Sequence, residues 1–411
     1  MPEKMSRRKL LHKGSEAIVA GGVGACAAAV AGAVPVTAAV AAPAAAKGVD
    51  YYEKLGLIPF INAGGTYTIL SASTMPDEVQ AAVALAAKKP VHLLELHEAA
   101  GNYLAGLTLG TAACITMGNK DAIVNIPTDL SGLKNEVIVQ KAHRYEYDHA
   151  MRNCGVKVVE VETVEQYQNA FTEKTVMTNF FNAEDAPISR EEWIRGAHQH
   201  GVPCFNDAAA DVPPISNLWN YTQMGFDLVA FSGGKGMRGP QCTGLLLGGK
   251  DLIDAARLNN SPNSNAVGRG LKVAKEDIIG MVAAVDWFLS QDDATMEAEF
   301  RKRADRIAEQ VKKVPTVETT VFIPPVANHV PHLLVTYDPA RVRTTGLEVM
   351  QKMREGKPRI ELNPGTGGGP ASAGLPGGEN TIIVEVWMLQ PGEDLIVGRR
   401  LREVLQNAAH S

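Results

Sequence analysis

The chain has 411 residues and a formal net charge of −5, from 40 Lys+Arg against 45 Asp+Glu. At ~100–200 residues per domain this length allows two or three domains, and a charged fraction of 21% excludes a protein that is disordered over most of its length. The acidic balance argues against a general nucleic-acid binder, which needs a basic face. Five cysteines without a CxxC pair indicate neither a disulfide framework nor a zinc ribbon.

The first 46 residues differ in composition from the rest. A paired arginine in the segment 6–11 (SRRKLL) precedes residues 17–46, which carry no charge and contain 15 alanines. This pattern predicts a twin-arginine export signal, cleaved after Ala46. The alternative is a membrane anchor, which Pro35 and Pro43 disfavour because they interrupt the apolar run. Removal of residues 1–46 takes away five positive and two negative charges, which leaves a chain of charge −8.

From residue 49 onward, short apolar runs alternate with amphipathic stretches, which predicts an α/β fold with buried parallel strands. Ser189 and Glu192 form a capping-box pattern that begins a helix over 189–200. The expected strands are 136–140, 156–161, 175–179, 202–206, 227–231 and 244–247, followed by helices over 277–290 and 298–314, strands over 319–323, 332–336 and 381–387, a Gly/Pro-rich loop over 364–378 and a helix over 393–408.

These elements predict two structural domains after the signal segment. Residues 47–274, with an N-terminal arm over 47–75, form a large domain with a mostly parallel sheet. Residues 275–411 form a smaller C-terminal α+β domain. No internal repeat is visible in the sequence.

The most informative segment is the loop that follows the strand ending at Phe231, with the sequence SGGKGMRGP over 232–240. Its glycines permit a tight turn that presents Lys235 in the middle. A lysine held in this way forms a Schiff base if its surroundings deprotonate the amine. The ordinary interpretation is an exposed side chain. A rival phosphate motif, Gly244-x4-Gly249-Lys250, is rejected because Asp251 stands where a P-loop needs Ser or Thr.

An aspartate precedes this lysine by one crossover. Asp207 directly follows the predicted strand 202–206 and lies 28 residues before Lys235, enough for one helix between neighbouring strand ends. In open α/β sheets, ligands bind at those ends. A carboxylate and a lysine placed so suit pyridoxal phosphate: the lysine holds the aldehyde and the aspartate keeps the pyridine nitrogen protonated. The ordinary interpretation of Asp207 is a helix cap.

With these residues in hand, the chain from about Tyr51 onward resembles the bacterial selenocysteine synthase-like family of fold type I pyridoxal-phosphate-dependent enzymes. The segments that carry the resemblance are INAGGT (61–66), DAAAD (207–211), SGGK (232–235) and GRGLK (268–272). The family includes seryl-tRNA selenium transferases and ammonia-lyases that act on phosphorylated sugar amino acids. The resemblance implies a fold type I architecture with pyridoxal 5'-phosphate as cofactor.

The resemblance also implies roles for individual residues. Lys235 would be the catalytic Schiff-base lysine, Asp207 the partner of the pyridine nitrogen and Ser232 a ligand of the cofactor phosphate. His143, just after the strand 136–140, would stack on the cofactor ring, or is an ordinary residue at a strand end. Arg269 and Lys272 could bind a phosphate across a dimer interface, although a solvated helix start is favoured. No metal site is predicted.

The chain departs from the family pattern near Thr108. A segment that leads into the phosphate-binding loop is shortened, so that residues 103–108 run directly into 109–113. Thr108, Gly110 and Thr111 are the residues that could substitute, and Thr111 is retained as a predicted cofactor ligand. The shortening supports an alternative function: an exported, non-catalytic binding protein that kept the fold but lost the phosphate loop.

The leading prediction is an enzyme, a lyase or transferase that performs β-elimination or β-replacement on a small amino acid or a sugar amino acid. A tRNA partner is disfavoured because the mature chain is acidic and an exported enzyme would not meet charged tRNA. The expected protein is a homodimer or higher homo-oligomer, periplasmic or extracellular, with no stable membrane insertion once the signal is removed.

Overall fold

The computed structural model describes residues 50–67, 70, 73–91, 95–96, 106–182, 186–325, 327–369 and 375–410. The predicted export signal over 1–46 lies outside the described residues. Two compact units divide the chain after Leu57. In the first unit, the short helix α2 (Tyr51–Lys54) begins at Asp50, whose side chain accepts hydrogen bonds from the backbone amides of Tyr52 and Glu53.

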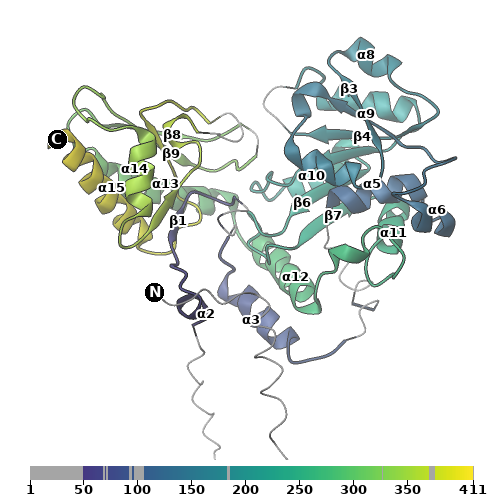
Figure 1. The fold of residues 1–411 in the computed structure, drawn as a ribbon, viewed down its shortest axis with the longest axis horizontal. Coiled ribbons are helices and arrows are strands. Elements are labelled where there is room, and N and C mark those ends of the chain that lie inside the picture. Colours follow the sequence, from purple (N-terminus) through teal and green to yellow (C-terminus); the bar gives the residue numbers. More distant parts are fainter. Residues whose placement is uncertain are drawn as a thin grey trace, which may run out of the picture. The chain divides into compact units, whose positions relative to one another are not determined.

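A six-stranded sheet forms the centre of the second unit (Figure 1). Its strands lie in the order β3-β2-β4-β5-β6-β7, and all neighbours are parallel except the antiparallel pair β6–β7. The mostly parallel sheet of the sequence prediction is therefore confirmed. The strands are β2 (Glu136–Gln140), β3 (Lys157–Val161), β4 (Thr175–Phe181), β5 (Cys204–Asp207), β6 (Leu228–Ser232) and β7 (Gly244–Gly248).

Helices cover this sheet on both faces, because alternate side chains of one strand enter two different cores. Val137 and Val139 of β2 pack with α5 and α11, whereas Ile138 packs with α9 and α10. Ser189 caps α9 through the amide of Glu192, as the sequence predicted. The elements around this sheet are α5 (Gly106–Thr116), α6 (Lys120–Asn125), η2 (Lys141–His143), η3 (Glu146–Asp148), α7 (His149–Arg152), α8 (Val164–Asn169), α9 (Arg190–Gln199), α10 (Asn217–Met224), α11 (Lys250–Leu258) and η4 (Arg269–Leu271).

A second core lies in the C-terminal part of the chain. There α13 (Asp293–Val311), α14 (Gly346–Arg354) and α15 (Glu393–His410) pack with the antiparallel sheet β11-β9-β8. Its strands are β8 (Glu318–Phe322), β9 (His332–Thr336) and β11 (Thr381–Glu385). The predicted elements are present, although α13 begins at Asp293, five residues before the expected start, because Asp292 caps it through the amide of Thr295.

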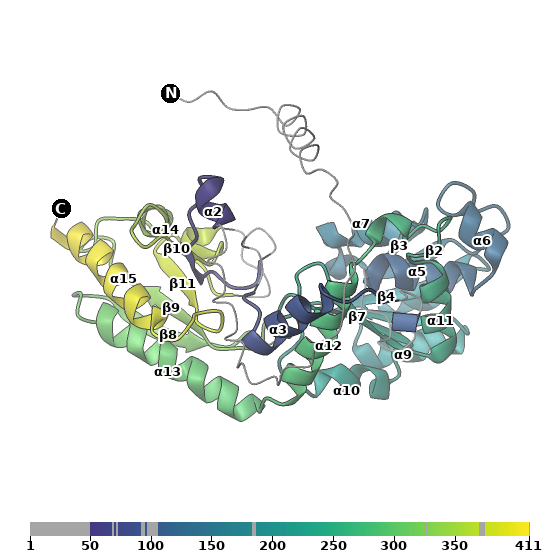
Figure 2. The same cartoon turned by 90° about the horizontal axis from the view of Figure 1, so that it is seen from below.

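The N-terminal arm joins this C-terminal core. Strand β1 (Ile61–Ala63) pairs in parallel with β10 (Ile360–Leu362), which precedes η5 (Thr366–Gly368). Ile61 and Ala63 are buried among the side chains of the C-terminal helices. Helix α3 (Asp77–Ala86) packs along α12 (Lys275–Leu289), as both views show (Figures 1 and 2). The boundary at residues 274/275 stays a prediction.

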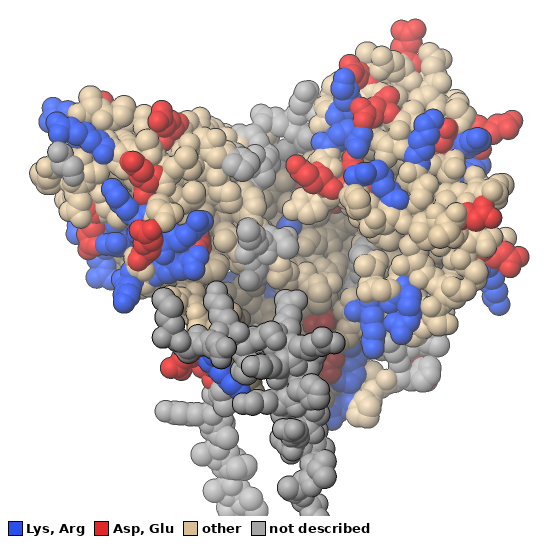
Figure 3. Space-filling model, in the orientation of Figure 1, with Lys and Arg blue, Asp and Glu red and all other residues tan. Residues whose placement is uncertain are grey.

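Charged side chains of both signs are interspersed on the face in Figure 3, so this face offers no continuous basic surface for a nucleic acid. Among the residues that the structure describes, no helix is both long enough and apolar enough to cross a membrane.

Candidate active site

The predicted site residues follow strands that end at the same edge of the large sheet. Asp207 is the last residue of β5 and Ser232 the last residue of β6, and these two strands are hydrogen-bonded neighbours. His143 follows β2 after one turn of 3-10 helix. Since parallel strands share the direction of their carboxyl ends, the topology collects these residues at one edge, where ligands bind in open α/β sheets.

The loop that carries Lys235 is held from several sides. The Gly233 amide donates to the Thr243 carbonyl at 2.9 Å, and the Gly239 amide donates to the Gly233 carbonyl at 2.8 Å. Outside the loop, the Ser73 hydroxyl donates to the Gly234 carbonyl at 2.7 Å. These bonds connect both ends of the loop to each other and its middle to the N-terminal arm, so Lys235 is presented from a fixed backbone.

Lys235 and Asp207 lie close enough for each charge to affect the pKa of the other. Burial lowers the pKa of Lys235, and the carboxylates of Asp207 and Asp211 oppose that effect only in part. Burial also raises the pKa of Asp207, against the opposing effects of its hydrogen bond with Tyr145 and the charge of Lys235. The site therefore combines an amine that is easily deprotonated with a buried carboxylate in need of a cationic partner.

Tyr145 is a site residue that sequence reasoning missed. Its hydroxyl donates a hydrogen bond to Asp207 Oδ2, and its ring stacks on Phe181 with 4.3 Å between ring centroids. The Ala209 amide donates to the other oxygen, Oδ1, at 3.2 Å. Burial and the neighbouring Asp207 raise the pKa of Tyr145, so the phenol stays protonated and keeps its role as donor. No local signal marks Tyr145, since 62 residues separate it from Asp207.

A second buried carboxylate, Asp211, lies behind Asp207. It accepts hydrogen bonds from the side chains of Asn182 and, at 3.0 Å, Tyr221. Burial raises the pKa of Asp211 to about 6. The hydrogen bonds from Asn182 and Tyr221 reduce this rise, and the charge of Asp207 increases it. The guanidinium of Arg190 donates to Asn182 Oδ1 at 2.9 Å and lies over the Tyr221 ring. Both acids of the DAAAD segment are thus internal, and neither serves as a helix cap.

His143 and Ser232 differ in accessibility. The His143 ring is buried, with its edge on Phe180 at 4.6 Å between centroids and its Nδ1 3.4 Å from the Phe181 amide. Ser232 is half-buried at the end of β6, three residues before Lys235. Ser232 therefore lies at the expected edge of the sheet. That the His143 ring stacks on the cofactor stays a prediction.

The structure does not bring Thr111 to this edge. The predicted loop over 109–113 is instead continuous helix, because α5 runs from Gly106 to Thr116. Thr111 lies on its second turn, fully buried, and its hydroxyl donates to the Leu107 carbonyl at 2.7 Å. The Thr108 hydroxyl is also occupied, by the Ala150 carbonyl at 3.0 Å. Neither hydroxyl is available to a phosphate, and we correct the prediction for Thr111 accordingly.

Arg269 and Lys272 are exposed, at and just after the short helix η4. That placement agrees with the solvated helix start favoured from the sequence.

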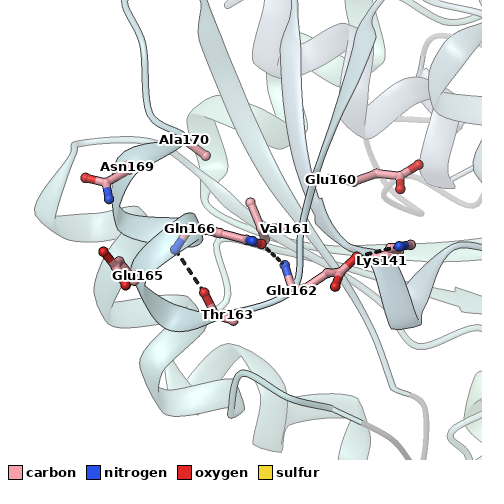
Figure 4. Close-up of a pocket in the computed structure, with 9 residues that line it drawn as sticks. All are labelled: Lys141, Glu160, Val161, Glu162, Thr163, Glu165, Gln166, Asn169 and Ala170. Carbon is pink, nitrogen blue, oxygen red and sulfur yellow. Dashed lines mark hydrogen bonds and ion pairs between the residues drawn. The ribbon is translucent and has the colours of Figure 1, made fainter.

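An open surface hollow of about 780 Å³ lies between β3 and α8 (Figure 4). Its carboxylates include Glu162, paired with Lys141 at 2.5 Å, and Glu160. None of the predicted site residues lines it. This hollow is an acidic, solvated surface and is not a candidate for the active site.

The residues at the sheet edge fit pyridoxal phosphate. An amine such as that of Lys235 and a buried carboxylate such as that of Asp207 are the kinds of group that suit its aldehyde and its ring nitrogen. Asn179 of β4 faces the same side as Asp207, and its buried amide has no hydrogen-bond partner in the described protein. Buried polar groups are normally satisfied, so this amide is a polar group on the cofactor side of the sheet that the described protein leaves unsatisfied. The described start of helix α5 lies against Ala230 of β6, two residues before Ser232, so it is close to this edge.

Comparison with known proteins agrees with this chemistry. Residues 158–336, which include Asp207 and Lys235, match the family described as aminotransferase class V. A 5'-C-glycyluridine monooxygenase-decarboxylase from Streptomyces is 27% identical, over 76% of this chain and 83% of that protein. D-glucosaminate-6-phosphate ammonia lyase from Salmonella typhimurium is 28% identical, over 63% of this chain and 75% of its own length.

More distant relatives extend the comparison. L-seryl-tRNA(Sec) selenium transferase from Aquifex aeolicus is 24% identical, over 63% of this chain and 65% of that protein. For two further selenium transferases that it matches, this chain spans about half of their length. The solved structure of D-glucosaminate-6-phosphate ammonia-lyase has a TM-score of 0.74, with 24% identity over 88% of this chain and 99% of that chain. A structure of SPT with PLP has a TM-score of 0.52, with 13% identity over 85% of this chain and 88% of that chain. The fold predicted from the sequence is confirmed.

Proposed function

We propose that this chain, a fold type I pyridoxal-phosphate-dependent enzyme of the selenocysteine synthase-like group, catalyses β-elimination or β-replacement on a small amino acid or a sugar amino acid. The observation that carries the proposal is the pairing of Lys235, whose pKa burial lowers, with the buried Asp207 at the end of the adjacent strand. Since the relatives named are enzymes, the comparisons support catalysis over the alternative of a non-catalytic binding protein.

When bound, the cofactor supplies an electron sink for the charge that develops next to the substrate amine. The protein's part is to hold it and to move protons. The Lys235 amine accepts the proton from the carbon that bears the substrate amine, because a lowered pKa leaves a larger neutral fraction of Nζ at neutral pH. The Asp207 carboxylate would hold the protonated ring nitrogen, and the Tyr145 hydroxyl fixes that carboxylate in place.

The phosphate is assigned to Ser232 and to the first amides of α5. A helix begins with four amides that have no partner within the helix, and the positive end of its dipole favours an anion. This arrangement uses backbone groups only, so it does not need the hydroxyls of Thr108 or Thr111. His143 remains in the proposal as the residue behind the cofactor ring.

Spectroscopy of the purified protein tests the proposal. The protein is expected to be yellow with added cofactor, and borohydride to fix the cofactor's mass on the peptide that contains Lys235. Lys235→Ala removes the label, whereas Lys250→Ala, which changes an exposed lysine paired with Asp254, retains it. A colourless protein that takes up no cofactor would refute the proposed function. A label that persists in Lys235→Ala would refute the choice of lysine.

The substrate class follows from the relative that is named an ammonia lyase of a phosphorylated sugar amino acid. A screen of amino acids and sugar amino acids for release of ammonia and keto acid is expected to find the substrate. Oxygen uptake and carbon dioxide release are followed in parallel, because another relative is named a monooxygenase-decarboxylase. Oxygen-dependent decarboxylation without ammonia would contradict the proposed reaction class. The acidic chain makes tRNA an unfavourable partner.

Export and assembly are part of the same proposal. The twin arginines Arg7 and Arg8 and the uncharged residues 17–46 support export to the periplasm or beyond. A reporter fused to residues 1–46 is expected to be exported, and Arg7→Lys with Arg8→Lys to block it. Release of the reporter into the soluble fraction would exclude the membrane anchor. Light scattering of the purified protein tests the predicted homo-oligomer, which a monomeric mass would refute.

A further inference from the structure

A cavity of about 270 Å³ lies beside the loop that carries Lys235, within the second unit of the chain. Gly236 and Arg238 of that loop contribute to its lining, whereas Lys235 does not. The rest comes from the end of α12, from the first turns of α13, from Pro213 and from the residues that follow β11. The cavity therefore touches the catalytic loop without containing its lysine.

Four aromatic residues contribute to the walls of the cavity. Trp287 and Phe288 come from α12, Phe300 from α13, and the buried Trp387 from the segment after β11. The Trp287 ring lies under the guanidinium of Arg238, at 5.8 Å from its centroid. Aromatic walls of this kind favour a flat, apolar ligand body, since ring pairs gain energy beyond the area that they bury.

Arg238 brings a positive charge that no described carboxylate neutralises. It has no ion pair in the described part of the chain, and its Nε donates to the Thr74 carbonyl at 2.9 Å. Burial lowers the pKa of Arg238, and the neighbouring charge of Arg303 lowers it further. The arginine is also held in the left-handed region, with a φ of +57°, which costs a non-glycine residue about 1–2 kcal/mol. The surrounding structure therefore keeps this cation in an unfavourable position.

The acidic residues that line the cavity are engaged elsewhere. Glu299 accepts from Arg303 Nε at 3.0 Å, and Arg303 also donates to the Leu389 carbonyl at 2.6 Å. Asp292 caps α13 through the Thr295 amide at 2.8 Å. Arg303 is thus neutralised by its own partner, while Arg238 is left as a partly buried cation next to aromatic rings. A partly buried cation without a counter-charge is a place where a ligand carboxylate can supply one.

We propose that this cavity is a second binding site, for an aromatic monocarboxylate whose carboxylate pairs with Arg238 and whose ring lies between Trp287 and Trp387. Its volume of about 270 Å³ is just below the ~300–1,000 Å³ of small-molecule pockets, which suits a small ligand with one ring. The fork of guanidinium donors matches a carboxylate. The occupant contacts the Lys235 loop through Gly236 and Arg238, so it is an effector site and not a part of the substrate site.

Calorimetric titration of the full-length protein with three probes tests the proposal. Phenylacetate carries both features, benzyl alcohol carries only the ring, and sulfate carries only charge. Phenylacetate is expected to bind at least ten-fold more tightly than either of the others. Arg238→Gln weakens phenylacetate at least ten-fold, while Arg301→Gln, an exposed arginine on α13 paired with Glu297, changes it less than two-fold. Equal binding of sulfate and phenylacetate would overturn the aromatic part of the proposal.

Tryptophan fluorescence provides a measurement that does not depend on an arginine variant. Phenylacetate is expected to change the fluorescence emission of the wild-type protein. Trp219→Phe, which replaces an exposed tryptophan on α10, is expected to keep this change. Trp287→Phe is expected to lose most of it. Retention of the full change in Trp287→Phe would place the ligand elsewhere. The titration is repeated with Lys235→Ala and no cofactor. Unchanged affinity supports a separate site, and a higher affinity without cofactor would show that phenylacetate competes for the cofactor site and would overturn the proposal.

Discussion

Gly236, the residue after the proposed Schiff-base lysine, occupies a space that has no room for a side chain. A Cβ built there would lie 2.0 Å from the Val212 carbonyl oxygen and 2.8 Å from the carbonyl carbon. Its φ does not require glycine, because Gly236 is not among the residues in the left-handed region. The constraint is therefore the close approach of two backbone segments, one after Lys235 and one after Asp211.

The displacement caused by Gly236→Ala follows from this distance. Real Cβ atoms essentially never approach other heavy atoms closer than about 3.0 Å, so the loop must move by about 1 Å. Overpacking of this kind costs typically 1–3 kcal/mol of unfolding free energy. A misplacement of about 1 Å at a reacting group costs roughly 100-fold in rate. The variant is therefore expected to remain folded, with lowered stability and a much larger loss of function.

Two measurements distinguish these effects. Urea unfolding gives the loss of stability, and cofactor absorbance with borohydride labelling gives the positioning of Lys235. Gly270→Ala is the matched control, because a Cβ there meets no atom within 4 Å. A Gly236→Ala protein with wild-type unfolding midpoint and wild-type labelling would refute the reasoning, since the loop would then accept a side chain that the geometry excludes.

Three further variants test the surroundings of the site. Tyr145→Phe removes a donor to the buried Asp207 carboxylate, which is expected to lower the free energy of unfolding by roughly 1–3 kcal/mol at neutral pH. It also raises the pKa of Asp207 further, because the hydrogen bond from Tyr145 lowers that pKa. As the pH is lowered, the cofactor affinity of the variant, measured by dialysis, is therefore expected to fall at a higher pH than that of the wild type. Asp211 has a pKa raised to about 6, so its protonated form contributes stability below about pH 4 that is lost as the pH rises through 6. Between these pH values, the unfolding free energy of Asp211→Asn is expected to rise by up to about 3 kcal/mol relative to that of the wild type. Urea unfolding that shows the same difference between the two proteins at every pH would contradict this. Gly65 has a φ of +94°, and a Cβ built there would lie 1.9 Å from the Glu385 carboxylate. Gly65→Ala is therefore expected to lower the free energy of unfolding by roughly 2–5 kcal/mol. An unchanged unfolding midpoint would contradict this crowding.

The sequence by itself determined the class of fold, and it predicted the two residues on which the proposed chemistry is centred. Short apolar runs and one clear cap predicted the strands of the large sheet and helix α9, because these signals are local. Lys235 and Asp207 were found for the same reason: glycines around a lysine and an acid at a strand end can be recognised without knowing what lies across the fold.

The tertiary structure decided everything that depends on contacts between distant segments. It placed the hydroxyl of Tyr145 on Asp207 across 62 residues, and it paired β1 of the arm with β10 near the other end of the chain. It also converted the expected loop around Thr111 into the interior of α5, because small residues there pack closely on β5 and β6. Burial sets pKa values and close approach sets which glycines cannot change, and both arise only when segments meet in space.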